Sequence, residues 1–208
     1  MTDKENRRRM SEGLIYDPNT DDLISEQLQL NDIVAQYNSL LPTQMEEKDK
    51  LTYRIFGSRG KNIYLESPFY TNWGGRHVFI GDNFYSNHCA TFIDDGNIYI
   101  GDNVMLGPNV TLITAGHPVA PELRLKGLQF NKDIHIGNNV WIGAGANILP
   151  GISVGDNCVI GAGSVVTKDI PSNCVAVGNP CRILRQIGDH DKEFYFKDLS
   201  IDPGALEY

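Results

Sequence analysis

Three polar side chains, in segments that otherwise carry mostly small or apolar residues, are of the types that acyl transfer needs. They are Asn87 in NFYSNH, Asp95 in FIDDGN and His117 in TAGHPV. Histidine is the usual general base near neutral pH, an asparagine amide can donate to a developing oxyanion, and a carboxylate can accept from a substrate hydroxyl. The three residues form no compact motif, so this chemistry depends on a fold that gathers them.

No Ser-His or Cys-His pair is placed in the sequence as a nucleophile with its base. Direct transfer of a group to an acceptor is therefore favoured over a covalent enzyme intermediate. Pro118 holds the backbone of His117 extended, so a role in shaping the loop is the alternative to catalysis. The other histidines are expected to be structural or solvent-exposed: His77, His88, His135 and His190.

The stretch from Ile134 to Thr167 repeats every six residues and sets the architecture. One aliphatic residue recurs in each hexad without a slip: Ile136, Ile142, Ile148, Val154, Ile160 and Val166. A period of six fits neither a helix nor a plain alternating strand, and it is the signature of a parallel β-helix. Three hexads form one coil of about 18 residues, and stacked coils bury a continuous aliphatic column.

The hexad pattern also occurs upstream, over residues 78–92 and 98–112. Glycine, asparagine and aspartate recur at the corners, where they fit turns that need a positive φ. Neighbouring coils of a β-helix lie about 4.8 Å apart. Side chains that are far apart in the sequence, such as Asn87, Asp95 and His117, can therefore form one surface cluster.

Composition excludes several classes of function. The 208 residues are 41% hydrophobic, which suits one principal domain with a small appendage. The net charge of −8 argues against nucleic acid or an anionic membrane as a partner. No apolar run approaches the roughly 20 residues of a membrane span, and no apolar segment follows MTDKENRRRM, so a signal peptide is not expected. Four cysteines without a C-x-x-C pair favour reduced thiols and a cytoplasmic location.

The chain divides into three parts. Residues 1–60 read as a small helical segment, in which Thr43 to Glu46 resembles a capping box that opens the third helix. Residues 61–187 are the expected β-helix, interrupted at 114–133 by a long loop that should project as an arm. A short helix is expected at 182–187, and residues 188–208 form a polar tail that contains aromatic residues.

The segments NFYSNHCATFIDDGNIYIGDNVMLGPNVTLITAGHPV and IHIGNNVWIGAGANILPGISVGDNCVIGAGSVVTKDIPSNCVAVGNPCRI closely resemble the maltose and galactoside O-acetyltransferases. The helical segment, with its Tyr16-Asp17 turn, also resembles that family. The resemblance implies a left-handed parallel β-helix, a homotrimer with active sites between subunits, and acetyl-CoA as the acyl donor. It implies no metal. The left hand follows from the family alone, because parallel crossovers are normally right-handed.

The family resemblance also assigns roles to single residues. His117 matches the catalytic base and Asn87 the residue that holds substrate and stabilises the transition state. Sugar contacts correspond to Asp17, Asp95 and Trp141, with ordinary packing as the alternative for the tryptophan. The positions that correspond to CoA contacts are Ala144, Ala162, Thr167, Lys168, Arg182 and Arg185. Small outward residues allow a pantetheine arm to approach backbone amides, and cations can meet the CoA phosphates.

Other functions fit the same residues less well. A carbonic anhydrase-like metalloenzyme would need further histidines on adjacent coils, but positions 112 and 122 are Leu112 and Glu122. A non-catalytic scaffold would not require converging His, Asn and Asp. Acetyl transfer to a different acceptor, such as an antibiotic or an amino sugar, stays open. The lead-in FYTNWGGRHVFIG is one residue longer than is usual in the family, which leaves the acceptor contact near Thr71 and Asn72 undefined.

Overall fold

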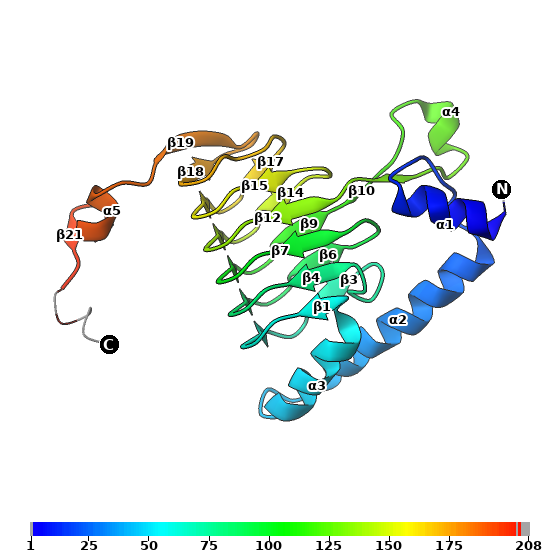
Figure 1. Cartoon of the computed structure of the whole chain (residues 1–208), viewed down its shortest axis with the longest axis horizontal. Helices are drawn as coiled ribbons and strands as arrows, with labels where there is room; N and C mark the ends of the chain where they lie inside the picture. Colours follow the sequence, from blue (N-terminus) through cyan, green and yellow to red (C-terminus); the bar gives the residue numbers. More distant parts are fainter. Residues whose placement is uncertain (1, 203, 205–208) are drawn as a thin grey trace.

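A computed structural model, which describes residues 2–202 and 204, contains a parallel β-helix with three sheet faces (Figure 1). Face I consists of β1 (Ser58–Arg59), β4 (Val78–Ile80), β7 (Ile98–Ile100), β12 (Ile134–Ile136) and β15 (Ser153–Val154). Face II consists of β2 (Tyr64–Leu65), β5 (Tyr85–Ser86), β8 (Met105–Leu106), β13 (Trp141–Ile142), β16 (Val159–Ile160) and β18 (Cys174–Val177). Face III consists of β3 (Tyr70–Thr71), β6 (Thr91–Ile93), β9 (Thr111–Ile113), β14 (Asn147–Ile148) and β17 (Val165–Val166). The expected β-helix is confirmed.

The hexad pattern predicts the core. All six of its recurring aliphatic residues are buried, with exposed fractions of at most 4%. They join one continuous apolar cluster with the inward residues of the earlier coils, such as Ile98 and Leu112. Each strand of the faces contributes only two to four residues, so the column of stacked side chains, rather than strand length, holds the coils together.

Asparagines form a ladder along the edge between faces I and II. Six of them adopt a positive φ between 55° and 63°, a region that asparagine tolerates better than other residues with side chains. The side-chain amide of each donates to the next at 2.8–3.0 Å: Asn62, Asn83, Asn103, Asn139, Asn157 and Asn173. The corner residues of the hexads therefore fix the turns and also tie neighbouring coils together.

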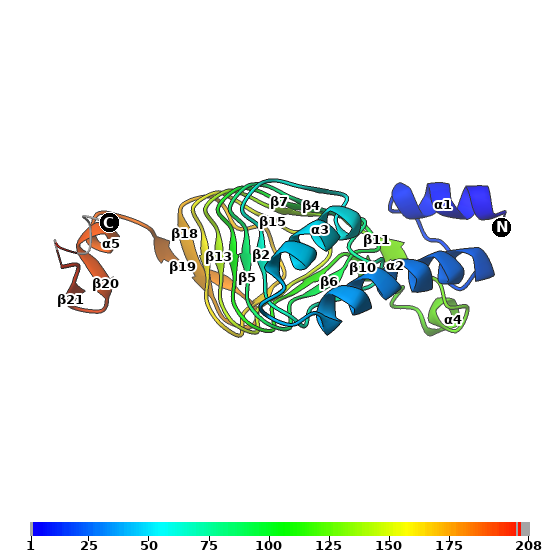
Figure 2. The same ribbon diagram turned by 90° about the horizontal axis from the view of Figure 1, so that it is seen from below.

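The N-terminal segment forms α1 (Asp3–Ser11), α2 (Asp21–Ser39) and α3 (Met45–Ile55). Figures 1 and 2 show α3 at the end of the solenoid where β1 begins. Ile55 and Phe56 enter the same apolar cluster as the coils, so this end of the core is covered. The expected capping box is wrong, because Gln44 rather than Thr43 precedes the helix and makes no side-chain cap bond.

The loop at 114–133 forms an arm on a two-stranded stem. Strand β10 (Ala115–Gly116) pairs antiparallel with β11 (Phe130–Asn131), and the outer part contains the short helix α4 (Pro121–Arg124). The stem also pairs with the N-terminal segment, since Tyr16 and Gln129 exchange backbone hydrogen bonds of 2.9 and 3.0 Å. The stem strand β11 consequently lies beside α1.

The chain leaves the solenoid through β19 (Arg182–Gln186), which pairs antiparallel with β18. The short helix expected at 182–187 is thus wrong, because these residues extend the sheet of face II. The tail continues as α5 (His190–Glu193), β20 (Phe194–Phe196) and β21 (Leu199–Ser200), and it stands away from the solenoid in both views (Figures 1 and 2). Residues 203 and 205–208 of the expected tail lie outside the described residues.

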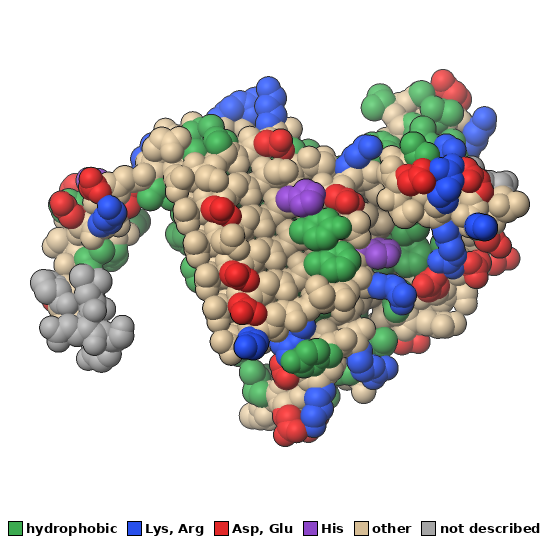
Figure 3. Space-filling view, in the orientation of Figure 1, with side chains coloured by type: hydrophobic (Ala, Val, Ile, Leu, Met, Phe, Trp, Pro, Cys, Tyr) green, Lys and Arg blue, Asp and Glu red, His purple; other side chains and the backbone are tan. Residues whose placement is uncertain are grey.

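The outer surface of face I carries a ladder of stacked rings. Phe79 lies over Tyr99 with ring centroids 5.1 Å apart, and Tyr99 lies over His135 at 4.9 Å. Figure 3 shows hydrophobic side chains and a histidine in line on this face. None of the predicted site residues belongs to it. No helix in the described part of the chain is long and apolar enough to cross a membrane.

Candidate active site on two edges of the solenoid

His117 follows strand β10 at the base of the arm, and its side chain is exposed. Its Nδ1 lies 2.8 Å from the carbonyl oxygen of Leu128. A carbonyl can only accept, so Nδ1 carries a hydrogen, and in the neutral imidazole the lone pair is on Nε2. The hairpin stem therefore holds the imidazole in the tautomer that a general base requires, with Nε2 directed away from the backbone.

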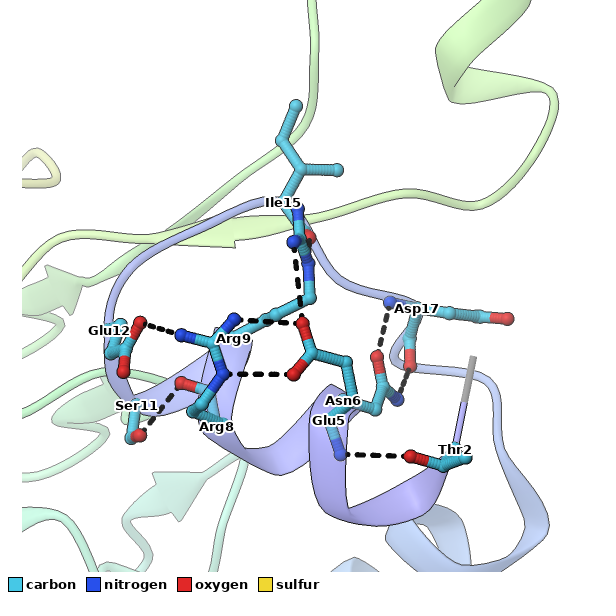
Figure 4. A network of polar contacts seen from close by, with 9 residues as sticks. All are labelled: Thr2, Glu5, Asn6, Arg8, Arg9, Ser11, Glu12, Ile15 and Asp17. Carbon is cyan, nitrogen blue, oxygen red and sulfur yellow. Dashed lines mark hydrogen bonds and ion pairs between the residues drawn. The ribbon is translucent and has the colours of Figure 1, made fainter.

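Asp17 lies opposite Leu128, because Tyr16 pairs with Gln129. Its backbone is clamped by Asn6, whose Nδ2 donates to the Asp17 carbonyl at 2.5 Å and whose Oδ1 accepts from the Asp17 amide at 2.9 Å (Figure 4). Carboxylate oxygen Oδ1 accepts from the amide of Asn19 at 2.9 Å. Helix α1 therefore fixes Asp17 beside the segment that orients His117.

Asp95 is 4% exposed and lies at the centre of a polar network under the arm. Its Oδ1 accepts from Gln129 Nε2 at 2.8 Å and from Trp73 Nε1 at 3.3 Å. Its Oδ2 accepts from Asn72 Nδ2 at 2.7 Å. Asn72, near which the sequence left an acceptor contact undefined, thus lies against Asp95.

The network extends to two further groups. Burial, and then the charge of Asp95, raise the pKa of Tyr16, so the phenol stays neutral and donates to Asn131 Oδ1 at 3.3 Å. Asp94 accepts from the backbone amides of Asn72 and Trp73 at 2.9 and 2.7 Å, and burial raises the pKa of its carboxyl. Asp94 thus fixes the loop that reaches Asp95.

Asn87 lies elsewhere, on the edge between faces II and III, immediately after β5. Its Oδ1 accepts from the amide of His88 at 2.7 Å. Within the described residues, Nδ2 has no acceptor and remains available as a donor. The side chain is half-buried and anchored at one end only, as expected for a group that donates to a bound oxyanion.

Ala144 and Ala162 lie on this same edge, two and three coils further along. Both are exposed, and among the described residues their backbone amides donate to no acceptor. A Cβ at Gly107 would lie 2.7 Å from the amide nitrogen of Ala144, and one at Gly143 would lie 2.6 Å from that of Ala162. Glycine is therefore required for the close stacking that makes this edge a flat ledge with free amides.

Trp141 is on the outer surface of face II and is 52% exposed. Its register neighbours on β8 and β5 are Met105 and Tyr85, which also point outward. Half of the side chain is exposed, so Trp141 is not part of the core of this chain. The column offers an apolar wall next to the edge that carries Asn87 and Ala144.

The predicted cations lie in two places. Arg182 and Arg185 lie on β19, and Arg185 forms a two-point ion pair with Asp191 at 2.6 and 2.7 Å. This contact lowers the pKa of Asp191 to about 2. Thr167 and Lys168 are exposed on the opposite edge, between faces III and I. Lys168 makes no ion pair with any described residue.

The structure therefore sorts the predicted residues into two sets. The III/I edge carries Asp95, His117, Thr167 and Lys168, with Asp17 docked beside them. The II/III edge and face II carry Asn87, Trp141, Ala144, Ala162, Arg182 and Arg185. Within one chain, face III separates Asn87 from His117. Sequence reasoning did not identify Tyr16, Trp73, Gln129 and Asn131, although the last two lie where the hexads break.

On each edge, the residue with a predicted role toward the acceptor, Asp95 or Asn87, comes earlier along the solenoid than the residues predicted to contact CoA. Asp95 and Asn87 belong to the same coil, which contains β4, β5 and β6. Ala144 and Ala162 lie two and three coils later on the II/III edge. Lys168 lies three coils later on the III/I edge. Among the described residues, no group of three or more His, Cys, Asp or Glu side chains is arranged to hold a metal ion.

Comparison with known proteins gives matches over nearly the whole chain. Residues 133–168 match the model described as bacterial transferase hexapeptide (six repeats), and residues 9–60 match the maltose acetyltransferase hexapeptide capping motif. A galactoside O-acetyltransferase of Lactococcus lactis is 44% identical over 95% of this chain and 96% of its own. A solved galactoside acetyltransferase in complex with coenzyme A has a TM-score of 0.91 and 43% identity, and covers 95% of this chain and 98% of its own. A maltose O-acetyltransferase from Clostridium difficile has a TM-score of 0.86 and 43% identity, over 88% of this chain and 98% of its own.

Proposed function

The chain belongs to the maltose and galactoside O-acetyltransferases of the hexapeptide-repeat class, and from this premise we propose that it transfers acetyl from acetyl-CoA to a hydroxyl of a sugar or glycoside. The observation that carries the chemistry is the orientation of His117. Its Nδ1 is occupied by the Leu128 carbonyl, which leaves Nε2 as the nitrogen that can face a substrate. This arrangement suits deprotonation of a hydroxyl directed at a thioester.

The transfer proceeds in one chemical sequence without a covalent enzyme intermediate. Nε2 of His117 takes the proton of the acceptor hydroxyl while that oxygen attacks the thioester carbonyl carbon. Nδ2 of Asn87 donates to the carbonyl oxygen as it becomes an oxyanion. Collapse of the tetrahedral species breaks the carbon–sulfur bond, and the proton passes from the imidazole to the leaving CoA sulfur.

Substrates are held along the two edges. The acceptor hydroxyls meet Asp17 and Asp95, with Trp141 as an apolar wall. The pantetheine arm lies on the ledge and accepts from the free amides of Ala144 and Ala162. The CoA phosphates meet the cationic and hydroxyl groups further along the chain: Thr167, Lys168, Arg182 and Arg185.

The active protein is a cyclic homotrimer in which each site combines the III/I edge of one subunit with the II/III edge of the next. Two observations support this assembly. Asn87 and His117 lie on different edges of one chain, and both edges have the same order along the solenoid. In a cyclic arrangement the solenoid axes are parallel, so corresponding coils of adjacent subunits face one another. In an antiparallel pair, the residues proposed to bind the acceptor would instead face the residues proposed to bind CoA.

A cytoplasmic location agrees with the four cysteines, all of which are free thiols. The most direct test of the function is an acceptor screen with acetyl-CoA, in which release of the free thiol is followed across monosaccharides, glycosides, aminoglycosides and amino sugars. We expect sugars or glycosides to give the highest kcat/KM. Turnover with only an antibiotic or an amino sugar would identify the other acceptor class, and no binding of CoA by calorimetry would exclude the enzyme.

A further inference from the structure

Glu66 occupies the position next to Asn87 on the II/III edge, one coil nearer the N-terminal helices. The two residues are equivalent in register, since Glu66 follows β2 and Asn87 follows β5, and their amides donate to Ser86 and Leu106 at 2.9 Å. One coil corresponds to about 4.8 Å. The ledge lies on the other side of Asn87, so in the proposed site an acceptor that extends away from CoA would pass over Glu66.

The Glu66 carboxylate is suited to receive a ligand hydroxyl. Its side chain is 28% exposed, and Oε1 accepts from the Tyr64 hydroxyl at 3.2 Å. His88 Nδ1 lies 4.0 Å from Oε2, but that nitrogen is already bound to the carbonyl of Ser67 at 2.7 Å. Oε2 therefore keeps its capacity to accept.

A cavity of about 340 Å³ opens below Glu66, between face II and α3. Its lining includes Lys48, which is only 7% exposed and lies over the ring of Tyr37. The ammonium donates to Ser67 Oγ at 2.7 Å, and in the described structure it makes no other hydrogen bond. Two of its three donors remain for a ligand. The volume falls at the lower end of the range of ligand pockets, which starts at roughly 300 Å³.

We propose that this cavity is a distal acceptor subsite that takes the second ring of a disaccharide or longer oligosaccharide. Glu66 Oε2 accepts from one hydroxyl of that ring, and Lys48 donates to another of its oxygens. Lys48 is a buried donor and Glu66 is a half-buried acceptor. Such a pair suits a ring that carries several hydroxyls better than an apolar substituent of a glycoside. The assignment rests on the proposed sugar acetyl transfer, and it identifies the preferred acceptors as oligosaccharides.

The test compares kcat/KM for maltose with glucose and for lactose with galactose, using thiol release from acetyl-CoA. In wild-type protein we expect a disaccharide to be preferred in at least one pair. Glu66→Gln should lower this disaccharide-to-monosaccharide ratio about tenfold, because the hydrogen bond to the ligand hydroxyl loses its charged acceptor. Met45→Trp should lower it similarly, since this residue lines the cavity and is 48% exposed, so the larger ring can fill the space.

Glu47→Gln is the matched control, because it makes the same change on the exposed side of α3 and does not line the cavity. It should leave the ratio and the basal rate unchanged. Thermal unfolding of each variant verifies that it is folded. If the wild-type protein acetylates monosaccharides as well as disaccharides, and neither variant changes the ratio, the subsite is refuted while the proposed function stands. If no sugar is acetylated, the proposed function itself fails.

Discussion

Individual side chains gain their chemistry here from contacts that lie far away in the sequence. His117 acquires a defined tautomer because of Leu128, and Asp95 is held by residues from two separate segments: Asn72 and Trp73 from the first coil and Gln129 from the arm. The sequence was sufficient to select Asn87, Asp95 and His117 as candidates by their types. It could not predict the network around Asp95, because that network forms only when the helical segment, the first coil and the arm meet.

At this scale the base can be tested directly. His117→Ala should reduce kcat by roughly 10²–10⁴-fold, the usual contribution of general base catalysis. Binding of CoA, measured by calorimetry, should be unaffected, because the ledge lies on another edge. His135→Ala, which removes an exposed imidazole stacked on Tyr99, is the matched control and should retain wild-type activity. Near-wild-type turnover of His117→Ala would refute the assignment.

Among the elements, regular ones were predictable and irregular ones were not. The hexads specify where each strand lies and which residues point inward, because every coil repeats the same steric requirement. Strand β19 was not expected, since its pairing with β18 depends on the end of the solenoid rather than on its own sequence. The start of α3 was also misplaced, because the side chain of Gln44 accepts from the amide of Leu41, before the helix, instead of from within it.

The ledge formed by the coils can be tested by adding bulk to it. Ala162→Trp should raise KM for acetyl-CoA about tenfold or more, because the exposed ring would cover amides that contact pantetheine. The unfolding temperature should change little, since the side chain points into solvent. Ser153→Trp places the same bulk outward on face I of the same coil and should leave KM unchanged. Equal KM values for both variants would contradict the position of CoA.

For the whole molecule, the central feature is that one chain carries the two halves of the proposed site on different edges. The sequence resemblance implied sites between subunits, and the single chain gives a physical reason for them: face III separates His117 from Asn87. The arm and α1 lie beside the III/I edge, which carries His117 in the proposed site. The family resemblance also implied the number of subunits, which no pattern within the sequence determines.

Complementation between two inactive variants tests this account most directly. His117→Ala and Asn87→Ala subunits are each expected to be inactive alone and are mixed in equal amounts by co-expression. In a random cyclic trimer, about one quarter of the sites would combine an intact His117 with an intact Asn87 from the neighbour, so about one quarter of wild-type kcat should return. If both residues acted within one chain, no mixed site would be complete. Activity of the mixture no higher than that of the separate variants would contradict the composite site.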